Sequence, residues 1–261
     1  MNIIVLLKQT FDTEAKIQLD SNNNVITDNI QYIINPYDEF ALEEAIRIKE
    51  KLGDVIITVV SMGPRKVEEA LRQALAMGAD KSILLNDEVL FGGDEHTAAV
   101  ALSQTIKQIP YDLIIGGQVA IDDGSGQVAI RVAEILDIPQ VNLVTKLDVE
   151  NNKLAAHRQV EVGTEVIEVF LPAMITAQKG LNEPRYPALK GIMQAKKKEL
   201  KILGLADLGL TENQVGSNGA NLKVISTFLP APRNAGRILS GEISENVQEL
   251  VRLLREEAKI I

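Results

Sequence analysis

Apolar runs alternate with amphipathic segments along the first two thirds of the chain. Five runs are predicted to be strands: residues 3–7, 55–60, 82–85, 113–115 and 141–144. They are nearly continuous, which is typical of strands buried on both faces of a sheet. Four helices are expected between them, over residues 36–53, 64–77, 94–109 and 126–136. Strands that alternate with helices form parallel sheets through right-handed crossovers. The pattern therefore predicts an α/β fold with a doubly wound parallel sheet.

The pattern changes near residue 145. Residues 146–149, 154–162 and 165–171 are strand-like, and turn signals at 150–152 and 163–164 separate them, so we expect an antiparallel addition to the sheet. A further short strand is predicted over 172–177. Residues 201–261 are looser and end in an amphipathic helix over 244–259. We divide the chain into a domain of residues 1–200 and a C-terminal extension of residues 201–261, which is expected to pack mainly on another subunit. The alternative is an extension that folds onto its own domain.

The first long helix carries clear start signals. Asn35 is a plausible cap, Pro36 suits the first turn, and the charges of Asp38 and Glu39 favour the positive end of the helix dipole.

Composition excludes several classes of function. The chain has 261 residues, a net charge of −9 and no cysteine. Nucleic-acid binding is not expected because phosphate contacts need a basic face, and disulfides, thiolate nucleophiles and Cys-based metal sites are excluded within the chain. The two histidines, His96 and His157, have no metal-binding or hydrolase motif around them. No signal segment and no membrane insertion are expected, so we predict a cytoplasmic protein.

A glycine-rich loop between a strand and a helix is the best candidate site for chemistry. In an open parallel sheet, ligands bind beyond the carboxyl ends of the strands, at the switch in strand order. Residues 116–128 occupy such a place, and their small side chains let the backbone approach a phosphate. Ser125 offers a hydroxyl, and the N–H groups near Gly126, Gln127 and Val128 would face the anion. The alternative is a tight structural turn, because the loop is not a GxGxxG motif.

A second unusual segment covers residues 181–198. Pro184 and Pro187 stiffen the chain around Tyr186, and an amphipathic helix with Leu189 and Ile192 follows. The helix closes on three lysines, residues 196–198, whose charge suits the negative end of its dipole. These features favour an exposed docking element, although an ordinary loop and helix would show the same spacing.

Taken together, these stretches resemble the β subunits of electron-transferring flavoproteins over essentially the whole chain. The matching segments are residues 5–9, 35–45, 74–80, 116–123 and 181–198. The family signature is also followed over 156–176, by Arg158, Glu161, Gly163, Glu165, Ile167 and Pro172, with Val162 as a departure. The resemblance implies an adenine-nucleotide α-hydrolase-like version of the parallel sheet. It also implies an α subunit that carries a redox-active FAD, and a second nucleotide in the β subunit itself.

The family has two groups, which differ in that second nucleotide. Simple carriers hold a structural AMP, whereas the bifurcating group holds a second FAD that accepts electrons from NADH. Thr13, the loop over 91–97 and the short loop over 122–128 resemble the bifurcating group. Residues 95–96 and 129–130 depart from its usual pattern. We favour FAD and keep AMP as the alternative.

The resemblance assigns roles to named residues. Those expected to bind the nucleotide are Leu7, Lys8, Asn35, Met62, Asp94, Thr97, Gln118, Asp122, Ser125, Gly126, Gln127 and Val128. Asp94 should meet a ribose or ribityl hydroxyl, since a carboxylate repels phosphate. Arg158 helps to place a flavin or the α subunit, or else forms a cross-strand ion pair with Glu161 or Glu165. Those expected to dock on a flavin-dependent dehydrogenase are Tyr186, Leu189 and Ile192.

The expected function is therefore that of an electron-carrier subunit without substrate chemistry of its own. Together with the α subunit it would move electrons from NADH to the dehydrogenase and to a low-potential acceptor such as ferredoxin. The rivals are a simple carrier with AMP, a standalone universal-stress-like nucleotide-binding module, and an ATP-pyrophosphatase-type enzyme. The last would need a Ser-Gly-Gly-x-Asp-Ser loop, which the sequence lacks.

Overall fold

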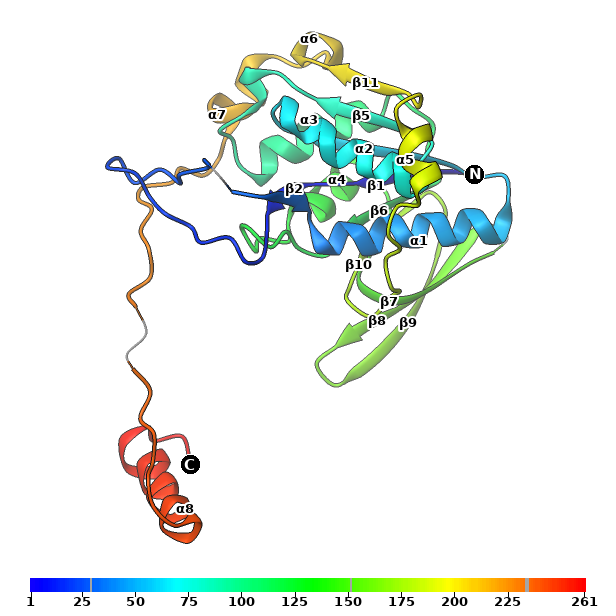
Figure 1. Cartoon of the computed structure of the whole chain (residues 1–261). Coiled ribbons are helices and arrows are strands. Elements are labelled where there is room, and N and C mark those ends of the chain that lie inside the picture. Colours follow the sequence, from blue (N-terminus) through cyan, green and yellow to red (C-terminus); the bar gives the residue numbers. More distant parts are fainter. Residues whose placement is uncertain (29, 151, 233–234) are drawn as a thin grey trace. The chain divides into compact units, whose positions relative to one another are not determined.

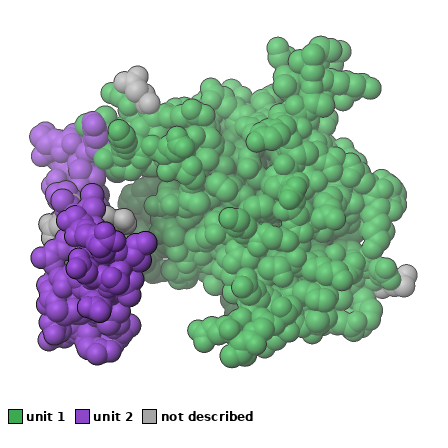
Figure 2. All heavy atoms as spheres, turned by 60° about the horizontal axis from the view of Figure 1, so that its bottom comes forward, with its two compact units in different colours: residues 1–17, 26–225 green, residues 18–25, 226–261 purple. Residues whose placement is uncertain are grey.

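The computed structural model describes residues 1–28, 30–150, 152–232 and 235–261. Part of the turn predicted over 150–152 lies outside these residues. The chain divides into two compact units, one of residues 1–17 and 26–225 and the other of residues 18–25 and 226–261 (Figure 2). Within the described ranges, every helix is too short or too polar to cross a membrane.

The first unit is built on a nine-stranded sheet (Figure 1). In spatial order its strands are β11 (Leu200–Leu203), β5 (Lys81–Leu85), β4 (Ile56–Met62), β1 (Asn2–Leu6), β6 (Leu113–Gly117), β10 (Ala173–Ala177), β7 (Gln140–Glu150), β8 (Lys153–Val160) and β9 (Gly163–Phe170). Neighbouring strands from β11 to β7 are parallel, whereas β7, β8 and β9 pair antiparallel. The α/β fold with a parallel sheet and an antiparallel addition is thus confirmed.

Helices cover both faces of the sheet. One face carries α1 (Pro36–Leu52), α2 (Glu68–Met77) and α5 (Leu189–Ala195), and the other carries α3 (Glu95–Ile106) and α4 (Val128–Leu136). Ile3 and Val5 of β1 point into the first layer, and Ile4 and Leu6 point into the second. Because successive side chains of a strand face opposite ways, burial on both sides requires the unbroken apolar run that the sequence shows.

Several short elements complete the first unit. A separate two-stranded antiparallel sheet joins β2 (Gln9–Phe11) to β3 (Tyr32–Ile34). Among the residues of this unit that the structure describes, the remaining helices are two four-residue turns, α6 (Leu205–Leu208) and α7 (Gly216–Gly219), and three 3₁₀ turns over Arg65–Val67, Glu88–Leu90 and Glu212–Gln214. The sequence did not reveal the two short strands, which are only three residues long and partly polar.

The antiparallel addition differs from prediction in one respect. The strands expected over 141–144 and 146–149 are a single eleven-residue strand, β7. Leu143 has a positive φ of 60°, and the pairing register shifts between Val144 and Lys146. The prediction of two separate strands was therefore wrong, because the irregularity bends one strand without ending it. Its first half belongs to the parallel sheet and its second half to the hairpin.

The first compact unit also extends further than residue 200. Strand β11 adds to the edge of the sheet beside β5, and the unit continues to Ile225. The second unit contains α8 (Ile243–Arg252), followed by a π-helical turn over Leu253–Glu257. This agrees with the amphipathic helix expected over 244–259. Packing of the extension on another subunit stays a prediction.

Candidate functional site

The switch in strand order lies between β1 and β6. From β1 the chain proceeds through β4 to β5 on one side of the sheet, whereas β6 and β10 lie on the other side. Their carboxyl ends form one row, which we call the crest. Leu7 and Lys8 directly follow β1, Met62 ends β4, and Gln118 directly follows β6. The fold thus brings these predicted residues to one edge, as the rule for open parallel sheets requires.

A buried carboxylate on α1 joins the two strands at the switch. The Asp38 Oδ2 atom accepts a hydrogen bond from the Lys8 backbone N–H at 2.7 Å, and Oδ1 accepts one from the Gly117 N–H at 3.0 Å. Burial raises the pKa of the Asp38 carboxyl to about 7, although these N–H groups and the charge of Lys8 oppose the rise. A side chain at Gly117 would lie 2.8 Å from the Tyr37 carbonyl carbon, so the close approach requires glycine. Sequence reasoning placed Asp38 only in the helix dipole and missed this role.

Asn35 occupies the N-cap position of α1, as the sequence predicted, but its side chain makes no cap hydrogen bond. Its Nδ2 instead donates to the Val119 carbonyl at 2.9 Å, and its Oδ1 accepts from the Ile121 N–H at 3.2 Å. The Asn35 side chain therefore holds the loop after β6. Its Oδ1, which would accept the N–H bond of a helix cap, accepts the Ile121 N–H instead.

Lys8 reaches the same loop from the other side. Its Nζ lies 2.8 Å from Asp122 Oδ1 and 2.7 Å from Asp123 Oδ2. Partial burial lowers the pKa of Lys8, but the two carboxylates outweigh that effect and the pKa is raised overall. Lys8 therefore stays charged and ties the end of β1 to residues 122–123.

The loop then turns into α4. The Ser125 N–H donates to Asp123 Oδ1 at 2.9 Å, and Gly126 has a positive φ of 60°. Gln127 is the N-cap residue, but its Oε1 accepts from Arg131 at 2.6 Å and α4 has no side-chain cap. The first N–H groups of an uncapped helix attract anions, because they combine free donors with the positive end of the dipole.

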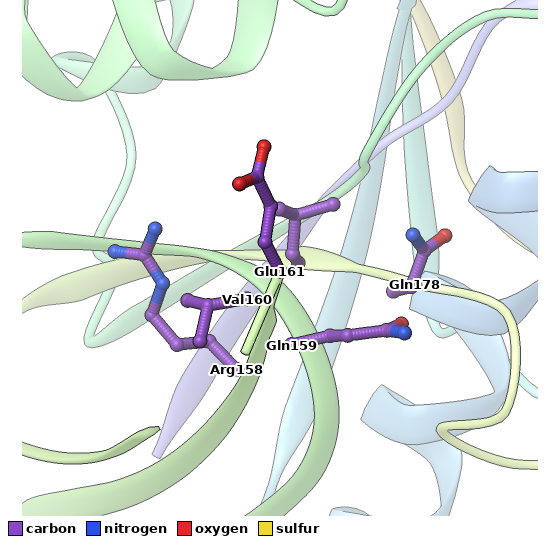
Figure 3. Close-up of a pocket in the computed structure, with 6 residues that line it drawn as sticks. Arg158, Gln159, Val160, Glu161 and Gln178 are labelled. Carbon is purple, nitrogen blue, oxygen red and sulfur yellow. The ribbon is translucent and has the colours of Figure 1, made fainter. Parts of the chain in front are cut away.

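Gln118 connects the crest to the bend in β7. Its N–H donates to the Ala177 carbonyl at 3.0 Å, and its Oε1 accepts from the Leu143 N–H at 3.2 Å. Beside this contact the surface is hollowed over about 500 Å³, between Leu143, Arg158, Gln159, Val160, Glu161 and Gln178 (Figure 3). Arg158 lies 3.6 Å from Glu165 across the hairpin, which is the ion pair that the sequence offered as one alternative.

Asp94 and Thr97 lie at the start of α3. Asp94 Oδ1 accepts from the Thr97 N–H at 3.0 Å, and the Thr97 hydroxyl accepts from the Asp94 N–H at 3.1 Å. Asp94 Oδ2 accepts from the N–H groups of Asn221 at 2.7 Å and Leu222 at 3.1 Å. Desolvation would raise the pKa of Asp94, but these three N–H bonds and His96 outweigh it and lower the pKa. An ionised carboxylate has about four acceptor positions, so one remains for a hydroxyl.

The predicted docking residues lie elsewhere, on the segment around α5. Tyr186 is 95% exposed, Leu189 77% and Ile192 44%. Three large apolar side chains on one short segment are unusual on a protein surface unless a partner covers them.

Comparisons with known proteins agree with this architecture. Residues 23–208 match the family model described as the electron transfer flavoprotein domain. The chain is 49% identical to an electron transfer flavoprotein subunit beta of Bacillus subtilis, over 100% of both chains. It is 48% identical to the protein of the same name from Thermoanaerobacterium thermosaccharolyticum, over 97% of this chain and 98% of that one. It is also 37% identical to the caffeyl-CoA reductase-Etf complex subunit CarD of Acetobacterium woodii, over 98% of each.

Proposed function

Because the chain belongs to the electron transfer flavoprotein family as a β subunit, we propose that it binds FAD along the crest and pairs with an α subunit that carries another FAD. Bound flavin supplies the redox chemistry, and this chain supplies position and charge. The αβ pair moves electrons from NADH to a flavin-dependent dehydrogenase and to a low-potential acceptor such as ferredoxin. Structural AMP in place of this FAD, in a simple carrier, is the second candidate.

The uncapped start of α4 at the strand switch is the observation that carries this proposal. Backbone N–H groups of residues 126–128 and the Ser125 hydroxyl would hold the phosphates, whereas the Ser125 N–H already donates to Asp123. The loop keeps its shape because Asn35 bonds to Val119 and Ile121 on one side and Lys8 bonds to Asp122 on the other.

The length of the crest favours an extended ligand. The proposed contacts run from Asp94, after β5, through Met62 and Leu7 to Gln118, after β6. Four neighbouring strand ends cover roughly 14 Å at about 4.8 Å per strand. A ligand that contacts both Asp94 and Gln118 must be extended, which favours FAD over AMP. The last acceptor position of Asp94 would then take a ribose or ribityl hydroxyl.

The partners follow from exposed apolar surface. Val247 and Leu250 of α8 are 54% and 47% exposed, and we propose that the α subunit covers this helix. Tyr186, Leu189 and Ile192 would enter an apolar site on the dehydrogenase. The relative CarD is named as a subunit of a reductase-Etf complex, so an enzyme that reduces or oxidises a CoA thioester is a reasonable partner class.

The test is to purify the αβ pair, release its ligands and count them. Two FAD per pair is the expected result, whereas one FAD and one AMP would favour the simple carrier. One FAD with no second nucleotide would refute the proposed site. Gly126→Ala and Gly124→Ala form a matched pair of variants, because both glycines have a positive φ, of 60° and 67°. Only a side chain at Gly126 would crowd the Gln118 carbonyl, at 3.1 Å, so only Gly126→Ala should lose the second nucleotide.

A further inference from the structure

The docking segment, residues 182–195, is tied to α1 by one arginine. Arg185 Nε and Nη2 each lie 2.9 Å from an oxygen of Glu43, which is a two-point contact. Arg185 Nη1 and Nη2 also donate to the two oxygens of Glu50, at 2.6 and 3.0 Å. The backbone N–H of Arg185 adds a bond to Glu43 at 3.2 Å. Paired donors that match a carboxylate in this way are geometrically specific.

The two carboxylates are not equivalent. The Glu43 side chain is 5% exposed, and the Glu50 side chain is 58% exposed. They lie seven residues apart on α1, which is about two helical turns, so both face the same way. A buried carboxylate without a partner is strongly unfavourable. Glu43 therefore needs Arg185, and the pairing restricts where the loop can lie.

Asn182 adds a second tie to the same helix. Its Nδ2 donates to the Phe40 carbonyl at 3.0 Å and to Glu44 Oε2 at 2.9 Å. Burial raises the pKa of Glu44 in spite of this bond. Together with Pro184, which fixes its own φ, these contacts leave the loop before Tyr186 little freedom.

The far end of the segment is tied to α2. Arg72 Nη1 donates to the carbonyls of Ala195 at 2.8 Å and Lys198 at 2.9 Å. Lys198 Nζ donates in return to the carbonyls of Leu75 at 2.9 Å and Ala79 at 2.6 Å. The sequence assigned Lys198 to the end of its own helix, but its side chain bonds to Leu75 in the last turn of α2 and to Ala79 just after that helix. Each basic side chain thus bonds to the C-terminal end of the other helix and to the turn that follows it.

The side chains between these ties are free. Tyr186, Leu189 and Met193 are 95%, 77% and 63% exposed. A surface that is already ordered loses less conformational entropy on binding than a flexible one. We propose that Arg185, held by Glu43 and Glu50, is a positioning residue that presents the apolar side chains of the docking segment to a flavoenzyme partner. This inference rests on the proposed docking function of Leu189.

The test uses the assembled αβ complex and a purified flavin-dependent dehydrogenase that exchanges electrons with the wild-type complex. Arg185→Gln should raise the KM for the dehydrogenase roughly tenfold, the effect of ordering two or three side chains. It should leave kcat and nucleotide content unchanged, and it should speed hydrogen exchange of the amides of residues 185–193. Leu189→Ala should raise KM without changing that exchange.

Lys51→Gln is the control, because Lys51 is an exposed cation of α1 whose ion pair, with Glu150 at 3.8 Å, involves none of the residues that hold the docking segment. It should behave as wild type. If the Arg185→Gln variant does not assemble with the α subunit, Glu50→Gln provides the same test, because it leaves Glu43 paired with Arg185. This variant should raise the KM for the dehydrogenase roughly threefold.

Failure of the docking function and failure of the inference about Arg185 give different results. Wild-type KM for Leu189→Ala would refute the docking function and this inference with it. A raised KM for Leu189→Ala beside a wild-type KM for Arg185→Gln would overturn the inference alone, as would an equal effect of Lys51→Gln. With Glu50→Gln as the substitute, a wild-type KM would overturn it in the same way.

Discussion

Asp38 gives the clearest quantitative prediction, because its carboxyl is buried at the strand switch. Its pKa is raised from 3.8 to about 7. For an acid with a raised pKa, the folded state binds more protons than the unfolded state between the two values. Stability therefore falls as pH rises from about 4 to about 7. A pKa raised by about 3 lowers the free energy of unfolding by about 4 kcal/mol, and the full loss is present above about pH 7.

The comparison that isolates this effect is wild type against Asp38→Asn. Asparagine has one side-chain oxygen, so the N–H of Lys8 or of Gly117 loses its acceptor. That loss costs about 1–3 kcal/mol at every pH. The asparagine does not titrate, however, whereas Asp38 does. The stability of the variant relative to wild type should therefore improve by about 2 kcal/mol between about pH 5.5 and about pH 7.5.

Urea unfolding of the αβ complex, followed by circular dichroism at fixed protein concentration, measures both terms. The constant offset reports the lost hydrogen bond, and the slope of the difference with pH reports the titration of Asp38. Parallel stability curves for the two proteins over this range would refute the reasoning. They would mean that the two N–H bonds outweigh burial, and that Asp38 is already ionised at pH 5.5.

Two further substitutions test the construction of the crest. Asn35→Ala removes the bonds to Val119 and Ile121 and should destabilise the loop by about 2 kcal/mol, which equilibrium dialysis would detect as weaker nucleotide binding; unchanged affinity would contradict its role as a loop clamp. Gly117→Ala places a carbon 2.8 Å from Tyr37 and should lower the melting temperature clearly, whereas Gly236→Ala, with nothing within 4 Å, should not; equal melting temperatures would contradict the close approach.

The parallel sheet was predictable because its signal is local. A strand covered on both faces must be apolar over its buried part, as residues 3–6 of β1 are, whichever strands lie beside it. Strand β11 shows the limit of this rule. Only Leu203 of its four residues is buried, since an edge strand needs fewer apolar side chains, and its short run did not stand out from the loop around it.

The site was predictable in outline only. The loop of residues 116–128 and its place at the switch followed from glycine content and strand order. The contacts that shape it did not, because they join residues far apart in the chain. Asp38 lies 79 residues from Gly117, and Lys8 lies 114 residues from Asp122. No periodicity encodes such pairs.

The start of α1 shows how local rules and the site compete for the same atoms. Asn35 has the residue type and position of a helix cap, a contact that typically stabilises a helix by about 1 kcal/mol. In the structure its amide bonds to the loop after β6 instead, and Asp38 turns its carboxylate to Lys8 and Gly117. The loop at the candidate phosphate site can therefore hold its shape only when β6 has paired beside β1. Formation of the site is in this way coupled to closure of the parallel sheet, and a change that separates these two strands should empty the site before it unfolds the helix.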